Sequence, residues 1–232
     1  HPVRMGRQGI VMLRSAVHEM RDAVTGRNYI ADYVQTFTHE VKSPLSAIRG
    51  AAELLQEEGM PIAQRERFLA NIARETQRIQ EIVDRMMELT ALETRRVLDR
   101  VEPVALRPLL EDVADGAQAA ASMRQVQLRL ELRADAATEG DPFLLRRAVS
   151  NLLANARVHT PAGVTVTTTL TPGPGYVDLT VADDGPGIDE ELLPILFDRF
   201  VRADKSRSRA LGSTGLGLAI VATIVKAHDG KV

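Results

Sequence analysis

Apolar residues in the first part of the chain recur at steps of three and four, the spacing that is typical of amphipathic helices. Over Ile10–Val24 this spacing continues for about two heptads and predicts a helix with a coiled-coil seam. It resumes over Tyr29–Leu92, where Glu58–Pro61 supplies a helix stop, a turn and a new helix start. We therefore predict a coiled-coil helix within residues 1–28 and an antiparallel hairpin of two long helices over residues 29–95.

Each helix of this hairpin carries one apolar stripe. The first stripe consists of Ile30, Val34, Phe37, Val41, Leu45, Ile48, Ala52 and Leu55, and the second of Leu69, Ile72, Thr76, Ile79, Val83 and Met86. One hairpin cannot bury both of its stripes. Pairing with a second copy would complete a four-helix bundle, and we therefore expect a homodimer.

After residue 95 the pattern changes to short elements of both kinds. Asp141 suits a helix N-cap, and Pro142 suits the first helical position. The predicted strands are Val104–Leu106, Val126–Leu132, Val164–Leu170 and Tyr176–Val181, and the predicted helices are Pro108–Met123, Asp141–Val158 and Leu216–Ala227. We therefore expect a separate α+β domain over residues 96–232.

Composition narrows the functional classes. The 232 residues include no cysteine, which excludes disulfides and thiolate metal sites. A net charge of −2, with five Phe, three Tyr and no Trp, gives no basis for a nucleic-acid partner. No apolar run reaches the roughly 18–20 residues that span a bilayer. The sequence begins with His1 rather than with Met, so we expect part of a longer protein, with any membrane anchor outside this sequence.

The stretch FTHEVKSPL contains a histidine that the helical pattern turns away from the seam. His39 lies two residues from both Phe37 and Val41, about 200° around the helix, so we expect it to point outward. A neutral imidazole has a free ring lone pair, and Glu40 could accept the opposite ring N–H if it curled back. Pro44 frees a backbone carbonyl one turn earlier and lets the helix bend. A lone helical histidine is more often a surface or packing residue, so this stretch alone leaves both meanings open.

Two segments of the α+β domain suit a nucleotide base and a metal ion. Asn151 and Asn155 lie four residues apart on one helix face, so their amides can point into one pocket. Asp183 follows a strand and can accept a hydrogen bond from an exocyclic amine, while Gly185 and Gly187 let the backbone approach a ring. Each signal is weak alone, because paired helical asparagines and glycine-rich turns are common.

Two further segments suit phosphates. The segment Leu196–Phe200 precedes a basic run, Arg202–Arg209, that suits a mobile flap, although such a run alone is more often a solvated loop. The segment Gly212–Leu218 is rich in glycine and opens a helix, so its free N–H groups and the positive end of the helix dipole favour an anion. No G-x-x-x-x-G-K-[ST] motif is present, which argues against a P-loop enzyme.

Together these segments carry a family resemblance. THEVKSPLSAIRGAAELL resembles the H-box of sensor histidine kinases of the HisKA type, and most of all the CreC-like group. The four later segments resemble, in order, the N, G1, F and G2 boxes of the Bergerat, or GHKL, ATP-binding domain. The resemblance implies a dimeric four-helix bundle followed by an α/β-sandwich ATP-binding domain over residues 96–232. It also implies a HAMP-like signalling helix over residues 1–28, and a final strand that would follow Val232.

The resemblance also implies roles for individual residues. His39 would be the phosphoacceptor, Glu40 its base, and Ser43 would replace the Thr or Asn that orients a water for dephosphorylating the partner. The cofactors would be ATP and Mg²⁺, with Asp183 on the adenine amino group. The other implied contacts are Asn155 and Asn151 for Mg²⁺, and Gly185, Gly187, Phe197, Arg199, Arg202, Lys205, Gly212, Thr214, Gly215, Leu216 and Gly217 for the base, the flap and the phosphates.

The sequence departs from the family pattern after the second asparagine, where Val158-His159 stands in place of a common Lys-Tyr pair. One phosphate or ribose contact would therefore be missing, or come from His159 or Arg157. The resemblance further implies phosphotransfer to an aspartate of a response regulator. It places the chain as the cytoplasmic portion of an inner-membrane sensor.

Two other functions are compatible with parts of this pattern. A GHKL-type ATPase would hydrolyse ATP to drive a conformational change, with His39 merely structural. A dimeric scaffold would bind nucleotide only as a sensor. We favour the kinase, because His39, Glu40 and both asparagines occur together.

Overall fold

The computed structural model describes residues 34–94, 98, 100–133, 135–202 and 214–232. The predicted seam Ile10–Val24 and most of the basic run lie outside these residues. The chain forms two compact units, His1–Ile79 and Gln80–Val232, whose boundary falls inside the long helix α2. The C-terminal part of that helix therefore belongs to the second unit, while the domain boundary at residue 95 stays a prediction.

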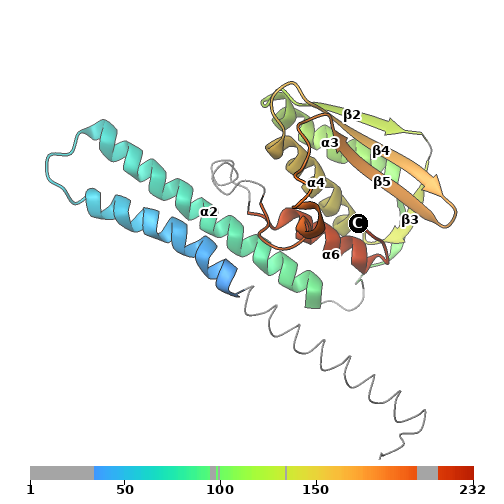
Figure 1. Cartoon of the computed structure of the whole chain (residues 1–232), viewed down its shortest axis with the longest axis horizontal. Coiled ribbons are helices and arrows are strands. Elements are labelled where there is room, and N and C mark those ends of the chain that lie inside the picture. Colours follow the sequence, from blue (N-terminus) through green and yellow to red (C-terminus); the bar gives the residue numbers. More distant parts are fainter. Residues whose placement is uncertain (1–33, 95–97, 99, 134, 203–213) are drawn as a thin grey trace, which may run out of the picture. The chain divides into compact units, whose positions relative to one another are not determined.

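The first unit is an antiparallel helical hairpin, as predicted. One helix is described from residue 34 to residue 54 and is here called the His39 helix (blue in Figure 1). The second helix is α2, Ile62–Thr94. In the turn between them Gly59 has a φ of +81°, a conformation that glycine adopts at little cost, and the Pro61 carbonyl accepts hydrogen bonds from the first turn of α2. The turn therefore forms at Glu58–Pro61, the stretch where the sequence predicted it.

Part of the predicted apolar stripes remains exposed on this hairpin. Val34, Leu45 and Leu69 have exposed fractions of 54%, 51% and 53%. In the C-terminal part of α2, the buried residues are Ile82, Leu89 and Leu92, none of which belongs to the predicted stripe. The predicted stripe ends at Met86, and its last members, Val83 and Met86, are half-buried. Leu89 and Leu92 follow it and pack on helices that come later in the chain.

The second unit is the expected α+β domain. Its strands are β1 Glu102–Ala105, β2 Gln127–Leu132, β3 Ala137–Gly140, β4 Thr165–Gly173 and β5 Tyr176–Asp183, and its other helices are α3 Leu106–Ser122, α4 Pro142–His159, the 3₁₀ helix η1 Leu193–Ile195 and α6 Gly217–Ala227. β1 pairs antiparallel with β3. In a second sheet of order β2-β4-β5, β2 is parallel and β5 antiparallel to β4. The sequence did not predict β3, whose four residues, ATEG, contain no alternating apolar pattern.

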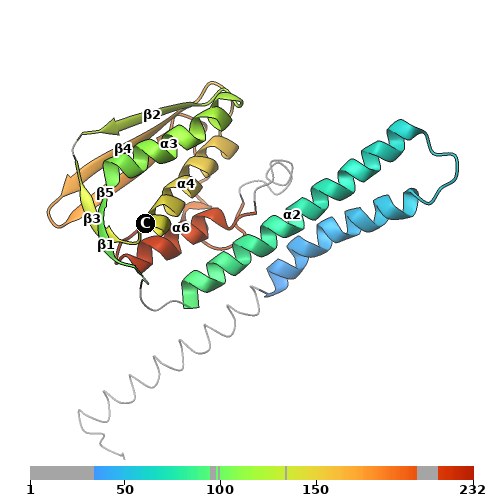
Figure 2. The ribbon, with the colours of Figure 1, turned by 180° about the vertical axis from the view of Figure 1, so that it is seen from behind.

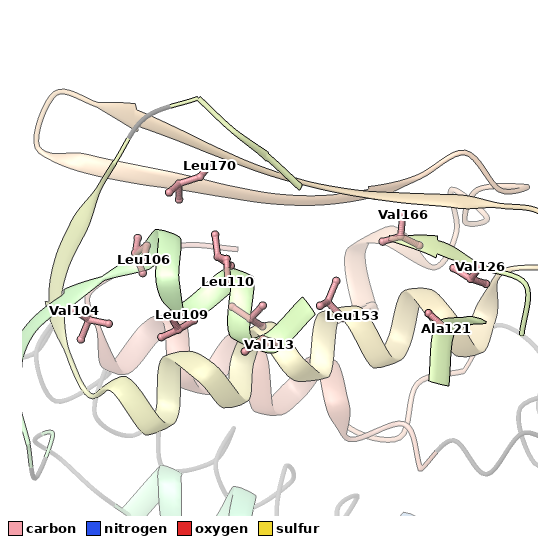
Figure 3. Close-up of a cluster of buried hydrophobic side chains, with 11 residues drawn as sticks. Val104, Leu106, Leu109, Leu110, Val113, Ala121, Val126, Leu153, Val166 and Leu170 are labelled. Carbon is pink, nitrogen blue, oxygen red and sulfur yellow. The ribbon is translucent and has the colours of Figure 1, made fainter. Parts of the chain in front are cut away.

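The main core lies between one face of the β2-β4-β5 sheet and helices α3 and α4 (Figures 1 and 2). Along β4, Val166, Thr168 and Leu170 are fully buried at every second position, which is the period of a strand with one face covered. Figure 3 shows Val166 and Leu170 above Leu110 and Leu153 of the helices. This core fixes α4, the helix that carries both candidate asparagines.

Two sets of hydrogen bonds hold the start of α4, one made by the side chain of Asp141 and one by its backbone. As predicted, Asp141 caps the helix, and its side chain accepts hydrogen bonds from the backbone N–H groups of Phe143 (2.9 Å) and Leu144 (3.2 Å). The backbone N–H of Asp141 in turn donates to Nε2 of His228, at the end of α6, over 3.0 Å. Among the described residues, no helix combines the length and the apolar character that crossing a membrane requires.

Candidate active site

The phosphoacceptor candidate lies on the outer surface of the hairpin. His39 and Ser43 are exposed on the His39 helix, whereas Pro44 is fully buried on its inner side. The helix continues through Pro44 to residue 54. An exposed imidazole on a helix whose opposite side is packed is accessible to a second reactant. The orientation that the sequence predicted for His39 is therefore the one observed.

Glu40 lies beside an arginine of the other helix. Its Oε2 atom is 3.7 Å from Nη2 of Arg78 on α2, and the two side chains are only 19% and 11% exposed. Burial of both groups makes this ion pair less screened than a surface pair. Arg78 therefore holds the Glu40 carboxylate against the inside of the hairpin, one residue from His39.

In the second unit, Asn151 is buried on α4 and its amide has a defined orientation. Its Nδ2 donates to the backbone carbonyl of Arg147, one turn earlier, over 3.0 Å. The amide oxygen is therefore directed away from that carbonyl and accepts a hydrogen bond from Nη1 of Arg85 over 3.4 Å. Asn155, one turn later, is partly exposed.

Asp183 ends β5 and organises the loop that follows. Its Oδ1 accepts the backbone N–H of Gly185 over 3.0 Å. A Cβ added to Gly185 would lie 2.6 Å from the same oxygen and 3.5 Å from Cγ2 of Thr160, the C-cap of α4. Gly187 has a φ of +78° and has open space where a side chain would begin. The Asp183 loop thus lies against the C-terminal end of α4.

The segments after η1 and before α6 are joined through their backbones. The N–H of Phe200 donates to the Gly215 carbonyl over 2.7 Å. A Cβ at Gly215 would approach Cα of Phe200 to 2.7 Å, and Gly215 has a φ of +70°, so both space and conformation require glycine here. Thr214, the preceding residue, is buried, and its hydroxyl has no hydrogen-bond partner among the described residues. A buried hydroxyl without a partner is an unmet hydrogen-bonding group, which a bound ligand could satisfy after a local movement.

Two of the predicted boxes meet at Gly217. A Cβ at this first residue of α6 would lie 3.5 Å from Oδ1 of Asn151 and 3.7 Å from Nη1 of Arg85. Burial lowers the pKa of the Arg85 guanidinium, and the nearby cation of Arg147 lowers it further. The hydrogen bond to Glu88 raises the pKa of Arg147. Arginine stays charged at neutral pH in either case, so the cation of Arg85 lies beside the Asn151 amide.

The remaining predicted contacts are distributed around α6 and α4. Phe197 and Arg202 are partly buried after η1, and Arg199 forms an ion pair with Glu93 of α2. Leu216 is buried in the core beneath α6. Lys205 and Gly212 lie outside the described residues.

The two suggested substitutes for the Lys-Tyr pair lie differently. Arg157 lines a groove between α3 and α4 together with Gly116 and Ala154. His159 is exposed at the last position of α4. On a helix, His159 is about 80° from Asn151, whereas Arg157 is about 120° away on the other side. The observed position therefore favours His159 for any contact near Asn155.

Sequence reasoning did not identify Arg78, Arg85 and Arg147. Each is one of many basic residues on amphipathic helices, where a charge is usually solvated. A usable signal exists only for Arg147, which lies one turn before Asn151. No group of three or more His, Cys, Asp or Glu side chains in the described parts of the chain is arranged to hold a metal ion.

Two family models match the chain. The model of the His Kinase A (phospho-acceptor) domain matches residues 30–95. The model of the histidine kinase-, DNA gyrase B- and HSP90-like ATPase matches residues 140–232. The two models therefore fall on the hairpin and on the α+β unit that hold the two parts of the site.

Known proteins resemble the chain over most of its length. The probable sensor histidine kinase TcrY of Mycobacterium tuberculosis is 40% identical over 228 residues, 95% of this chain and 48% of TcrY. The sensor protein CreC of Escherichia coli is 34% identical over 230 residues, 98% of this chain and 47% of CreC. The chain thus spans about half the length of the curated relatives it matches. The histidine kinase ThkA, solved in complex with the response regulator protein TrrA, has the same fold, with a TM-score of 0.71 at 20% identity over 93% of this chain and 61% of the matched chain.

Proposed function

This chain belongs to the sensor histidine kinases, and we propose that it phosphorylates its own His39 from ATP and passes the phosphoryl group to an aspartate of a response regulator. The observation that carries the proposal is the pairing of an exposed histidine on a phosphoacceptor hairpin with an ATPase unit in which Asn151 and Gly217 meet. ThkA, which has the same fold, was solved with a response regulator, and this supports the partner class.

In the proposed reaction His39 is the nucleophile. One neutral ring nitrogen attacks the γ-phosphorus of ATP in line, and the bond to the leaving ADP oxygen breaks. Glu40 would accept the proton from the opposite ring nitrogen. Arg78 supports this role indirectly, because the ion pair holds the Glu40 carboxylate in one place beside the histidine. Ser43, one turn after His39, would position the water that removes the phosphoryl group from the regulator.

The nucleotide would bind between α4, α6 and the loop after β5. Asp183 would accept the adenine amino group, beside Gly185 and Gly187. Thr214, Gly215 and Gly217 would face the phosphates, and the unpartnered Thr214 hydroxyl supports this placement.

Mg²⁺ is the metal that we expect with ATP. It keeps several waters and takes only one or two protein oxygens besides the phosphates, so the amide oxygens of Asn155 and Asn151 fit its needs. When bound, it would neutralise charge on the triphosphate.

The exposed apolar residues of the hairpin support a homodimer. Val34 and Leu45 are eleven residues apart, which puts them within about 20° of each other on one helix. A second hairpin would cover this line and the exposed Leu69 of α2. We also propose that the chain lies on the cytoplasmic side of a membrane sensor, where ATP and response regulators are available.

Incubation of the chain with γ-labelled ATP and Mg²⁺ tests the proposal. We expect a protein-bound label that is labile in acid and stable in alkali, as for phosphohistidine. The variant His39→Gln should lose the label and keep ATP binding, whereas the control His18→Gln should keep both. Mixed dimers of the wild type with His39→Gln would then show whether the transfer occurs within or between copies.

The two alternative functions predict other outcomes. Steady release of phosphate without protein label would favour a GHKL-type ATPase. Nucleotide binding with neither product would favour a nucleotide-sensing scaffold. Either outcome contradicts the kinase proposal.

A further inference from the structure

The last third of α2 packs on the two helices that carry the candidate nucleotide site. Leu89 and Leu92 are buried in a core cluster with residues of α4 and α6, which include Leu144, Ala148, Leu216, Ala219 and Ile220. Leu216 and its neighbours begin the helix at which phosphates are expected to bind. Docking of α2 is therefore coupled by packing to the phosphate end of the site.

Ion pairs hold this docked segment along its length. Glu88 accepts two hydrogen bonds from the Arg147 guanidinium, from Nε over 2.6 Å and from the second amino group over 2.7 Å. Such a bidentate pair fixes both side chains in orientation. One turn later, Glu93 pairs with Arg199. The segment is thus attached to α4 by one charge pair and to the region after η1 by another.

The third polar contact reaches the candidate metal ligand itself. Nη1 of Arg85 donates to Oδ1 of Asn151 over 3.4 Å, and it lies close to the backbone of Gly217. The amide cannot present its oxygen elsewhere without breaking the 3.0 Å bond from Nδ2 to the Arg147 carbonyl. The guanidinium therefore occupies the side of Asn151 that faces the start of α6.

We propose that Arg85 competes with Mg²⁺ for the Asn151 amide oxygen, so that docking of the α2 segment Arg85–Glu93 and binding of Mg·ATP oppose each other. The inference rests on the proposed function, in which Asn151 contributes to the metal site. A guanidinium and a divalent cation on one oxygen repel each other, and this repulsion is strong in a buried site. Docked α2 would hold the site in a nucleotide-poor state, and release of α2 would open it.

Thermodynamic linkage makes the effect reciprocal. If docking weakens the binding of Mg·ATP, then Mg·ATP must weaken docking by the same factor. The contact is therefore autoinhibitory. It can be tested through the effect of Arg85 on the binding of Mg·ATP, or through the effect of Mg·ATP on the docking of α2. Metal-free ATP lacks the competing cation and should affect docking little.

Calorimetric titration of the whole chain tests the effect of Arg85 on the binding of Mg·ATP. Arg85→Gln should tighten the binding of Mg·ATP by about 3- to 10-fold, the range expected for one weak hydrogen bond, and should change the binding of ATP in EDTA by less than about twofold. The control Arg74→Gln removes the same charge from an exposed position of α2 and should change neither. Weaker binding in Arg85→Gln would make Arg85 a phosphate contact, and unchanged binding would exclude competition. Either result overturns the proposal.

A thiol probe tests the effect of Mg·ATP on the docking of α2. This test does not depend on Arg85→Gln folding correctly. The chain has no cysteine, so one introduced thiol reports alone. Leu89 is 0% exposed and Met87, on the same helix, is 67% exposed. We expect Leu89→Cys to react slowly with a thiol reagent and at least about threefold faster at saturating Mg·ATP, in proportion to the linkage. Met87→Cys should react fast in both states. A Leu89→Cys rate that Mg·ATP does not change would contradict the proposal.

One more variant separates this inference from the proposed function. Asn151→Ala removes the shared oxygen. If Asn151→Ala leaves the Mg²⁺ dependence of ATP binding intact, the assigned metal ligand is wrong, and the competition fails with it. If Asn151→Ala abolishes that dependence while Arg85→Gln has no effect, the proposed function stands and only the competition fails.

Discussion

The two units of the molecule use their apolar residues in opposite ways. The second unit buries them in two clusters, one between the sheet and helices α3 and α4, the other among α2, α4 and α6. The hairpin leaves Val34, Leu45 and Leu69 about half exposed. The second unit buries its apolar residues within one copy, whereas the hairpin would need a second copy to cover its exposed apolar residues. This contrast agrees with the proposal that the hairpin is the site of assembly and the second unit is the site of ligand binding.

The largest expected effect comes from a charge on the uncovered face. Leu45→Asp should weaken the homodimer and leave the second unit folded. Burial of one Leu contributes about 1.5–3 kcal/mol and a dimer contains two copies, so the dissociation constant should rise about 10²- to 10⁴-fold. Sedimentation analysis over a dilution series measures it. Ser46→Asp adds the same charge at the neighbouring exposed position, in line with His39, and should have little effect. A Leu45→Asp variant that dimerises like the wild type would remove the contrast between the units.

Truncation of a core residue in the second unit should lower its free energy of unfolding by the same amount whether or not the protein dimerises. Leu110 of α3 is fully buried. Figure 3 shows its side chain pointing toward the sheet. Leu110→Ala should lower the free energy of unfolding of this unit by about 2–5 kcal/mol, since it leaves a cavity. Urea denaturation measures the change, which should be equal at protein concentrations tenfold apart. The exposed Gln118→Ala on the same helix should change the free energy by less than about 0.5 kcal/mol. A concentration-dependent shift for Leu110→Ala would show that this unit, too, depends on a partner.

The smallest expected effect concerns a single helix cap within the second unit. Asp141→Ala removes the acceptor for the N–H groups of Phe143 and Leu144, and should lower the free energy of unfolding by about 0.5–2 kcal/mol. Asp115→Ala on the exposed side of α3 provides the matched loss of a carboxylate. Equal stabilities of these two variants in urea denaturation would mean that the cap contributes nothing to the start of α4.

Much of this fold could be predicted because local chemistry and tertiary structure agree. The hairpin turn followed from Gly59 and Pro61, the start of α4 from Asp141 and Pro142, and β4 from its alternating residues. Helical periodicity alone predicted that His39 points outward. At these positions one short stretch contains the whole cause, so no contact distant in sequence was needed.

What could not be predicted depends on residues far apart in the chain. Arg85 and Asn151 are 66 residues apart, and Arg147 and Glu88 are 59 apart. Neither pair has a local pattern. The burial of Leu89 was missed for the same reason, since the sequence of one helix does not reveal which later helices of the same unit will cover it. The strand β3 is too short and polar to show an alternation.

The hydrogen bond from Asp141 to His228 has a consequence for the order of folding. The N-cap residue of α4 is held by a side chain 87 positions later. A ribosome releases these groups several seconds apart, at roughly 5–20 residues per second. Until α6 has emerged, the helix that carries both asparagines lacks one of its two anchors. During synthesis, completion of this helix start must therefore wait for the last helix, so a nascent chain should acquire its nucleotide affinity late.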